Sequence, residues 1–175
     1  ATIAIPLVLP PTVLGYYLLV AMGGASPLGG LYERLTGSPL AFSFEGLLVG
    51  SIIFNLPFAL MPMERAFESI PVEVRQAAEC CGLSWYRTMW RIELPLAWPG
   101  IVSALVMTIA HTVGEFGVVL MVGGNIPGET RTIAISIYDR VQAFDMGAAG
   151  AMSAFLLVFS LVTLALTSRL SRRVW

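Results

Sequence analysis

The chain changes character at residues 75–100, which read RQAAECCGLSWYRTMWRIELPLAWPG. Three arginines, two glutamates, two cysteines and three tryptophans crowd into this stretch, although 57% of the whole chain is hydrophobic and only 12% is charged. Average soluble domains carry about 25% charged residues. A polar stretch between long apolar runs is therefore expected to be a loop outside a membrane, and the fold is expected to be all-α and membrane-spanning.

Four apolar windows are long enough to cross the roughly 30 Å hydrocarbon layer, which takes about 20 helical residues. They cover residues 3–22, 40–62, 96–122 and 147–168, within a single membrane domain over residues 1–175. Three prolines in the first window argue against one straight helix, and Pro57 is expected to break the second. Residues 23–38 are expected to be an external loop. The chain starts inside an apolar run, so an earlier N-terminal helix is expected to be missing.

The positive charges are unevenly distributed between the connections. Seven arginines lie in the loop 63–95 or the C-terminal tail (Arg65, Arg75, Arg87, Arg91, Arg169, Arg172 and Arg173), and three lie elsewhere (Arg34, Arg131 and Arg140). Positively charged loops stay on the cytoplasmic side of a membrane. The loop 63–95 and the C-terminus are therefore expected in the cytoplasm.

The loop 63–95 carries start and stop signals for two short helices. Pro71 begins the first, over about residues 71–81, and Gly82 is expected to end it in the left-handed conformation. Ser84 is the expected N-cap of a second helix over about residues 85–92, which Pro95 stops.

The spacing within this loop resembles a family motif. Gln76, Ala77 and Ala78, then Gly82, and then Ile92, Leu94 and Pro95 are similar to the "EAA, three residues, Gly, nine residues, Ile-x-Leu-Pro" motif. That motif belongs to permease subunits of bacterial and archaeal ATP-binding-cassette importers. Gln76 stands where the family usually has Glu. The resemblance implies a type I importer fold, with a coupling helix between the second and third spans.

The resemblance also implies that the coupling helix docks on a separate ATPase subunit. The expected coupling residues are Arg75, Gln76, Ala77, Ala78, Glu79, Gly82, Ile92, Leu94 and Pro95. Ala77 and Ala78 are small enough for close approach to a partner. Arg75 and Glu79, at i and i+4, are expected to pair and hold the orientation of the helix.

No catalytic, cofactor or metal site is expected in this chain. It contains no lysine and no GxxxxGK[ST] sequence, so ATP and Mg²⁺ are expected in the partner ATPase instead. Cys80 and Cys81 are adjacent, and the one histidine lies in another segment, so they supply no set of zinc ligands.

A second group of residues lies in the third window. Gly100, Ala104, Thr108, His111 and Glu115 are three or four residues apart, which places them on one face of a helix. Ionisable groups inside a span are functional candidates, because burying one in lipid costs at least roughly 2.5 kcal/mol. Ala104, Thr108, His111 and Glu115 are expected to line the translocation path or its gate. The alternative is that Glu115 lies near the external interface and pairs with His111 or a loop arginine.

The segment after the third window predicts a short amphipathic external helix. Its apolar face is expected at Ile133, Ile137, Val141 and Phe144. In the last window, small residues four apart, such as Gly147 and Ala151, allow close helix contact.

The segments 6–19 and 114–142 look like the molybdate permease branch of the importer family. Sulfate and tungstate permeases share parts of these segments and remain alternatives. The resemblance implies a homodimer in the cytoplasmic membrane of a bacterium or archaeon, with two ATPase subunits, an external oxyanion-binding protein, surrounding lipid and no nucleic acid partner.

Two other classes of protein fit the sequence less well than an importer permease. A secondary transporter would show inverted repeats or charges that pair at mid-membrane. A membrane enzyme would need a convergent catalytic set, whereas His111 has Glu115 but no serine or cysteine nearby in the sequence. The predicted function is a non-enzymatic permease subunit that moves molybdate into the cytoplasm, and the secondary transporter is the alternative from another class.

Overall fold

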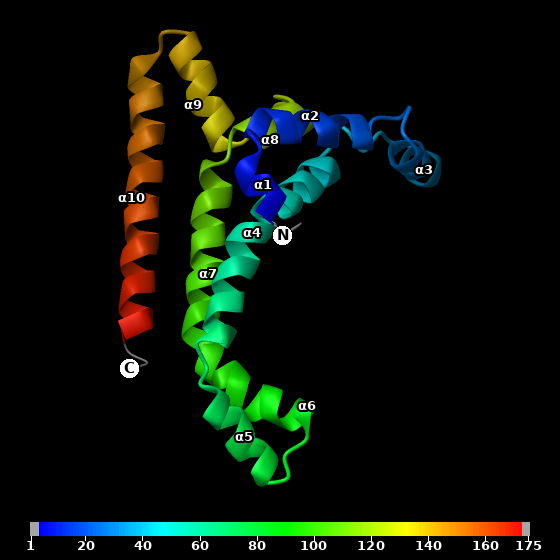
Figure 1. Ribbon diagram of the computed structural model, residues 1–175. Helices are drawn as coiled ribbons and strands as arrows, with labels where there is room; N and C mark the ends of the chain where they lie inside the picture. Colours follow the sequence, from blue (N-terminus) through cyan, green and yellow to red (C-terminus); the bar gives the residue numbers. More distant parts are fainter. Residues whose placement is uncertain (1–3, 173–175) are drawn as a thin grey trace. The chain divides into compact units, whose positions relative to one another are not determined.

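The computed structural model describes the backbone of residues 4–172 and the side chains of residues 4–165, so Arg173 lies outside the described residues and the Arg169 and Arg172 side chains are not described. In this part of the chain, all regular structure is helical (Figure 1). The helices are α1 (Ile5–Val8), α2 (Pro11–Met22), α3 (Pro27–Thr36), α4 (Phe44–Glu68), α5 (Val72–Cys80), α6 (Trp85–Thr88), the π-helical η2 (Met89–Glu93), α7 (Leu94–Gly114), α8 (Gly117–Gly123), α9 (Ile133–Gln142) and α10 (Met146–Arg172).

The chain divides into two compact units. Unit 1 comprises residues 1–57 and 110–159, and unit 2 comprises residues 58–109 and 160–175. The long helices α4, α7 and α10 each contribute residues to both units.

Three helical runs are long and apolar enough to cross a membrane. They are α4, the run Trp85–Gly114 and the α10 residues Met146–Ala165. A fourth span exists only if α2 and α3, which meet at a bend of 55°, are taken together. With 12 residues, α2 is roughly 18 Å long and too short to cross alone. The described part of the first window therefore forms two short helices, α1 and α2, and a complete span over residues 3–22 stays a prediction.

The expected break at the prolines of the first window is confirmed. Helix α1 ends at Val8, Leu9 is extended with ψ 139°, and α2 starts at Pro11. Pro11 occupies the first position of its helix, where the missing N–H has no partner to lose.

The prediction of a loop over residues 23–38 is wrong, because α3 forms there. The Ser26 side chain accepts a hydrogen bond from the Gly29 N–H at 2.9 Å, and Pro27 begins the helix. Gly37 ends it with φ 77°. A Cβ atom at Gly29 would collide with the carbonyls of Met22 and Gly23, so the turn between α2 and α3 requires a glycine there.

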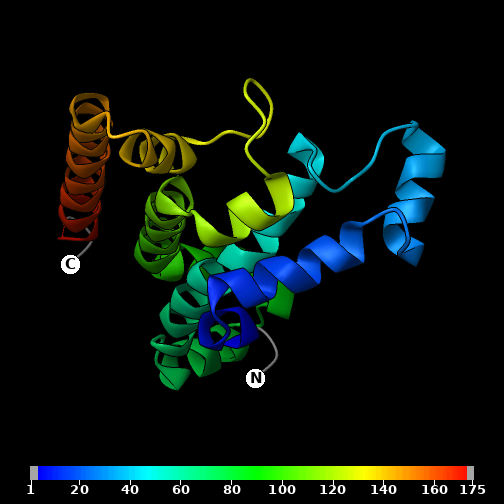
Figure 2. The ribbon, with the colours of Figure 1, turned by 90° about the horizontal axis from the view of Figure 1, so that it is seen from above.

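The core of unit 1 forms where α2 lies beside α8 (Figure 2). Its buried residues are Leu14, Met22, Leu40, Ala41, Phe54, Val118 and Val122. Gly15 is buried on α2, and an added Cβ would lie 2.7 Å from Met121 Cβ of α8. The glycine therefore lets the two helices approach closely.

The second window forms one helix without the predicted break at Pro57. Helix α4 runs for 25 residues through Pro57 and Pro62. The Asn55 Nδ2 atom donates to the carbonyl of Ser51 at 2.8 Å, one turn back along the same helix. This contact keeps the amide of Asn55 satisfied inside an apolar helix.

The third window is interrupted, so the prediction of one helix over residues 96–122 is wrong. Helix α7 ends at Gly114, and α8 starts at Gly117.

Pro95, near the start of the same window, does not stop the preceding helix as predicted. Helices α6, η2 and α7 form one continuous run from Trp85 to Gly114. The wide π turn of η2 lies directly before Pro95, where a proline removes an intrahelical hydrogen bond and crowds the preceding turn.

The amphipathic helix predicted after the third window is confirmed as α9, but its predicted face is wrong. Ile135 is fully buried, whereas Phe144 is 85% exposed and has φ 56°. Helix α10 covers the fourth window. Its small residues Gly147 and Ala151 are exposed. Among the described residues of this chain, no helix packs closely against them.

Candidate functional site

The polar loop folds into a helical hairpin, which we define as residues 71–93 in α5, α6 and η2 (Figure 1). Its corner is the predicted one: Gly82 has φ 73°, a left-handed conformation that favours glycine. The Gly82 N–H donates to the Glu79 carbonyl at 2.8 Å, and the Leu83 N–H donates to the Ala78 carbonyl at 3.1 Å. These two bonds form a Schellman motif, which satisfies the last carbonyls of α5.

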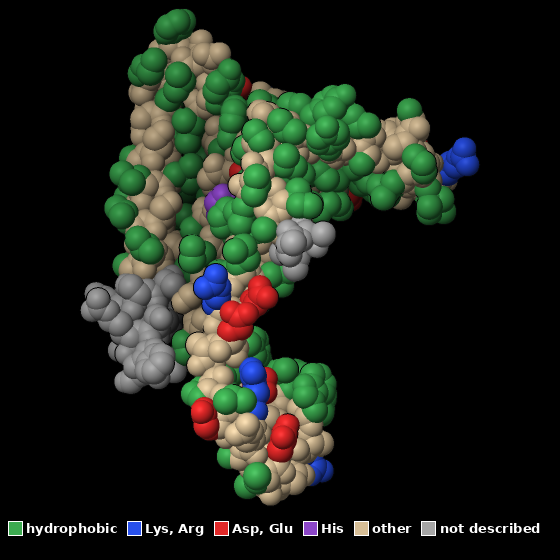
Figure 3. Space-filling model, in the orientation of Figure 1, with side chains coloured by type: hydrophobic (Ala, Val, Ile, Leu, Met, Phe, Trp, Pro, Cys, Tyr) green, Lys and Arg blue, Asp and Glu red, His purple; other side chains and the backbone are tan. Residues whose placement is uncertain are grey.

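The outer surface of the hairpin mixes exposed polar and aromatic residues. Gln76, Ala77 and Glu79 are exposed on α5, whereas Ala78 is buried within the hairpin. Trp85 is 75% exposed and Trp90 is 56% exposed. Figure 3 shows charged and hydrophobic side chains side by side on this part of unit 2. Large exposed rings on a polar hairpin are typical of a surface that binds another protein.

Arg75 has a different partner from the predicted one. Its Nε atom donates to Glu93 Oε1 at 2.9 Å, and its Nη2 atom donates to the Phe67 carbonyl at 3.0 Å. The predicted pairing with Glu79 is wrong. The Glu93 side chain is only 10% exposed, and sequence reasoning did not single it out. The position of the charged Glu93 directly before the apolar run that starts at Leu94 was a signal in the sequence for a buried ion pair.

A hollow of about 310 Å³ opens between the two arms of the hairpin. It is lined by Arg75, Glu79, Leu83, Trp85, Thr88 and Glu93. Ile92, Leu94 and Pro95 of the motif do not line the hollow. Ile92 lies in η2, and Leu94 and Pro95 begin α7 directly after the hairpin.

The predicted path residues fall into two groups. In unit 2, Ala104 is fully buried and Thr108 Oγ1 donates to its carbonyl at 2.8 Å. In unit 1, His111 Nδ1 lies 3.1 Å from Asn55 Oδ1. The centroid of the His111 ring lies 5.2 Å from that of Phe54. The contact between Asn55 and His111 was not predicted, although a polar group in each apolar span pointed to it.

Glu115 does not continue the face that runs from Gly100 to His111, because α7 ends before it. Its side chain is buried, and Oε1 accepts a hydrogen bond from the Val118 N–H at 2.8 Å. Glu115 thus satisfies one of the first free N–H groups of α8, where a negative charge is favourable.

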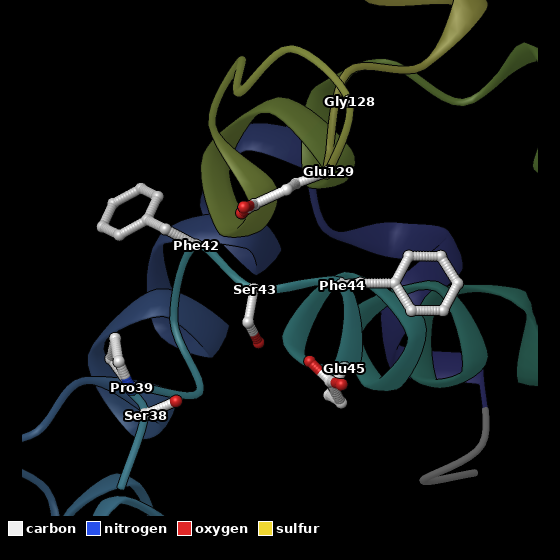
Figure 4. A pocket seen from close by; sticks show the side chains of 8 residues that line it. All are labelled: Ser38, Pro39, Phe42, Ser43, Phe44, Glu45, Gly128 and Glu129. Atoms are coloured by element: carbon white, nitrogen blue, oxygen red, sulfur yellow. The ribbon is translucent and has the colours of Figure 1, made fainter.

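A larger hollow, of about 640 Å³, lies in unit 1 (Figure 4). It is lined by Ser38, Pro39, Phe42, Ser43, Phe44, Glu45, Gly128 and Glu129. Figure 4 shows the Glu129 carboxylate extending toward the segment of Phe42 and Ser43. Two carboxylates in the lining repel anions, so this hollow is unsuited to an oxyanion.

The arginines after α8 are held by neighbouring side chains. Arg131 Nε donates to Asn125 Oδ1 at 2.6 Å, and its Nη2 lies 3.8 Å from Asp139 Oδ2. Arg140 Nη1 donates to Asp145 Oδ2 at 3.2 Å. These partly exposed pairs offset the positive charge that would otherwise attract an anion.

A family model described as "Binding-protein-dependent transport system inner membrane component" matches residues 1–175. A molybdenum transport system permease protein of Azotobacter vinelandii is 47% identical over 164 residues, covering 94% of this chain and 73% of the relative. Its counterpart in Haemophilus influenzae is 36% identical, covering 98% of this chain and 76% of the relative. A probable sulfate transport system permease protein of Chlorokybus atmophyticus is 30% identical, covering 94% and 57% respectively.

Proposed function

This chain belongs to the family of binding-protein-dependent transport system inner membrane components, and we propose that it moves molybdate into the cytoplasm, driven by a separate ATPase subunit. The observation that carries the proposal is the capped, exposed hairpin at residues 71–93, which lies at the position of the family motif. The chain is a multi-pass membrane protein. The hairpin is its site for docking the ATPase.

The surface of α5 supports this docking role. Gln76 and Ala77 are exposed side by side. Ala77 is small enough to let a partner approach closely, and the Gln76 amide can form hydrogen bonds with that partner. The exposed ring of Trp85 lies across the corner from them and offers apolar area for burial. Ala78 supports the hairpin from within, so its contribution to docking is indirect.

Molybdate is proposed as the substrate because the relatives from Azotobacter vinelandii and Haemophilus influenzae carry that function in their names. The sulfate permease relative is less similar, at 30% identity. An oxyanion-binding protein on the outer side selects the anion, and the permease supplies a path of low affinity. The hollow with Glu45 and Glu129 does not bind the anion in this proposal.

The subunit works as a homodimer, with the hairpin and the C-terminus in the cytoplasm and each hairpin on one ATPase subunit. ATP and Mg²⁺ bind in those ATPase subunits. Ala104, Thr108 and His111 lie on the path, and Glu115 shapes the path by holding the start of α8. The exposed apolar surface of α10, where Phe155 and Leu157 are more than 60% exposed, supports contact with lipid or the second subunit.

Uptake into vesicles tests the proposal. The permease is reconstituted with its cognate ATPase and binding protein, and labelled molybdate uptake is measured with ATP inside and competing oxyanions outside. We expect uptake to require ATP, and unlabelled molybdate to compete at a lower concentration than sulfate. Stronger competition by sulfate would make the chain a sulfate permease. Uptake driven by an ion gradient without ATP would make it a secondary transporter.

A pair of matched variants tests the docking surface. Ala77→Arg places a bulky charge on the exposed face of α5, and Ala143→Arg places the same group at an exposed position after α9. We expect Ala77→Arg to abolish co-purification of the ATPase subunit and Ala143→Arg to leave it intact. Equal binding of the ATPase by both variants would place the docking surface elsewhere.

A further inference from the structure

Arg75 joins three separate segments of unit 2. The residue lies in α5, its Nη2 atom binds the carbonyl of Phe67 in the last turn of α4, and its Nε atom binds Glu93 at the end of η2. The Phe67 carbonyl belongs to the last turn of α4 and also accepts from the Ile70 N–H at 3.3 Å, so Arg75 supplies its second donor. One guanidinium group therefore connects the helix before the hairpin with both arms of the hairpin, and the second arm continues directly into α7 at Leu94.

The partner carboxylate makes this connection specific. The Glu93 side chain is 10% exposed and the Arg75 side chain is 39% exposed. The carboxylate of the pair is therefore largely removed from water, whereas the guanidinium group remains partly exposed. A buried carboxylate that loses its partner is strongly unfavourable, because its charge has been removed from water. Arginine suits this position because its planar fork donates in two directions at once, which a lysine ammonium cannot do with the same geometry.

We propose that Arg75 is a positioning residue that makes the hairpin, the end of α4 and the start of α7 move as one body when the ATPase displaces the hairpin. This inference rests on the proposed function. It assigns to Arg75 an inward, force-transmitting role, distinct from the contact with the ATPase that the family motif implies. The ATPase displaces the exposed surface of Gln76 and Ala77, and the Arg75–Glu93 pair transmits this displacement to α4 and α7.

The transport experiment measures molybdate delivered per ATP hydrolysed. In the reconstituted complex, Glu93→Gln removes the charge of the pair and keeps the side-chain size. We expect the ratio to fall by about fivefold or more while the ATPase subunit still co-purifies, because a neutral amide holds the Arg75 guanidinium only about half as strongly as a carboxylate does. Arg34→Gln is the matched control, since Arg34 is an exposed arginine of α3, outside the hairpin, and it should keep the wild-type ratio.

A double-mutant cycle separates a shared connection from two independent effects. If Arg75 and Glu93 act together, Arg75→Gln combined with Glu93→Gln should lower the ratio no further than the worse single variant. Multiplication of the two single losses would overturn the proposal. Arg75→Lys covers the case in which Arg75→Gln does not fold, since it keeps the charge and loses the fork. A wild-type ratio in Arg75→Lys would also overturn the proposal.

Hydrogen exchange in the purified permease tests the same connection without any transport. Glu93→Gln should speed exchange of the α5 amides and leave those of α9 unchanged, and unchanged exchange in α5 would overturn the proposal. If the wild-type complex failed to transport molybdate with ATP, the proposed function would fall, and the exchange measurement would still decide whether Arg75 holds the hairpin.

Discussion

His111 Nδ1 lies 3.1 Å from Asn55 Oδ1, which places a polar contact between α7 and α4 inside unit 1. The Asn55 amide nitrogen is already used by the Ser51 carbonyl, so its oxygen faces the histidine ring. The buried Phe54 ring packs near the same histidine ring. The arrangement links two apolar helices through their polar groups, which is a common way to fix helix pairs in membranes.

Removal of the Asn55 amide should weaken this link. We expect Asn55→Leu to lower the stability of the solubilised permease by about 1 kcal/mol, because hydrogen bonds between membrane helices contribute about 0.6 kcal/mol on average and up to about 1.7 kcal/mol. Thermal unfolding in detergent measures the change. Leu56→Asn, at the neighbouring exposed position, is the control for a change in polarity alone. An Asn55→Leu variant as stable as the wild type would show that the contact contributes nothing to folding.

Glu115 should behave as a helix cap. Glu115→Gln keeps an oxygen that can accept from the Val118 N–H, whereas Glu115→Leu removes it. We therefore expect Glu115→Gln to remain within about 1 kcal/mol of the wild type, and Glu115→Leu to lose a further ~1 kcal/mol, the usual cost of a lost cap. Unfolding of the two variants in detergent gives the comparison. Equal stability of the two would mean that the hydrogen bond is not what Glu115 supplies.

The features of the hairpin that depend on local chemistry could be predicted from the sequence. Pro71 directly precedes α5, and Gly82 ends that helix in the left-handed conformation, as their local preferences predict. Ser84 occupies the predicted N-cap position of α6, although its side chain makes no capping hydrogen bond. The helical character of the apolar windows followed from length and hydropathy for the same reason.

Features that depend on partners far along the chain could not be predicted. Arg75 had an acidic neighbour at i+4, but Glu93, 18 residues away, lies where the hairpin folds back. The end of α7 at Gly114 also escaped prediction, because residues 96–122 are hydrophobic enough on average to be read as one continuous helix in spite of polar residues such as His111 and Glu115. Proline rules failed at Pro57 and Pro95, where continuation of α4 and the π turn of η2 outweighed the local preference to stop.

Close packing of α4 and α7 in unit 2 should depend on Gly100. A Cβ added there would meet the Cβ of Ala66 of α4, whereas a Cβ at Gly114 of the same helix has nothing within 4 Å. We expect Gly100→Ala to destabilise the permease by about 1–3 kcal/mol through overpacking. Gly114→Ala should have no such cost. Thermal unfolding of both variants tests the difference, and similar stability of the two would show that α4 and α7 separate without penalty.

A comparison of Gly82 with Gly37 separates the role of the hairpin corner in coupling from the loss of stability that any residue other than glycine causes at positive φ. Both have positive φ, 73° and 77°, and neither has an atom within 4 Å of an added Cβ. Alanine at either position should therefore cost a similar ~1–2 kcal/mol, because only the left-handed conformation is penalised.

Their effects on coupling should nevertheless differ, since Gly82 ends α5 and Gly37 ends α3. We expect Gly82→Ala to weaken binding of the ATPase subunit, and Gly82→Asn, which tolerates positive φ better, to restore part of it. Gly37→Ala should bind the ATPase normally at equal loss of stability. Co-purification, measured beside thermal unfolding, distinguishes the two effects. If Gly37→Ala lost the ATPase to the same extent, general instability would explain the loss, and the corner at Gly82 would have no special part in coupling.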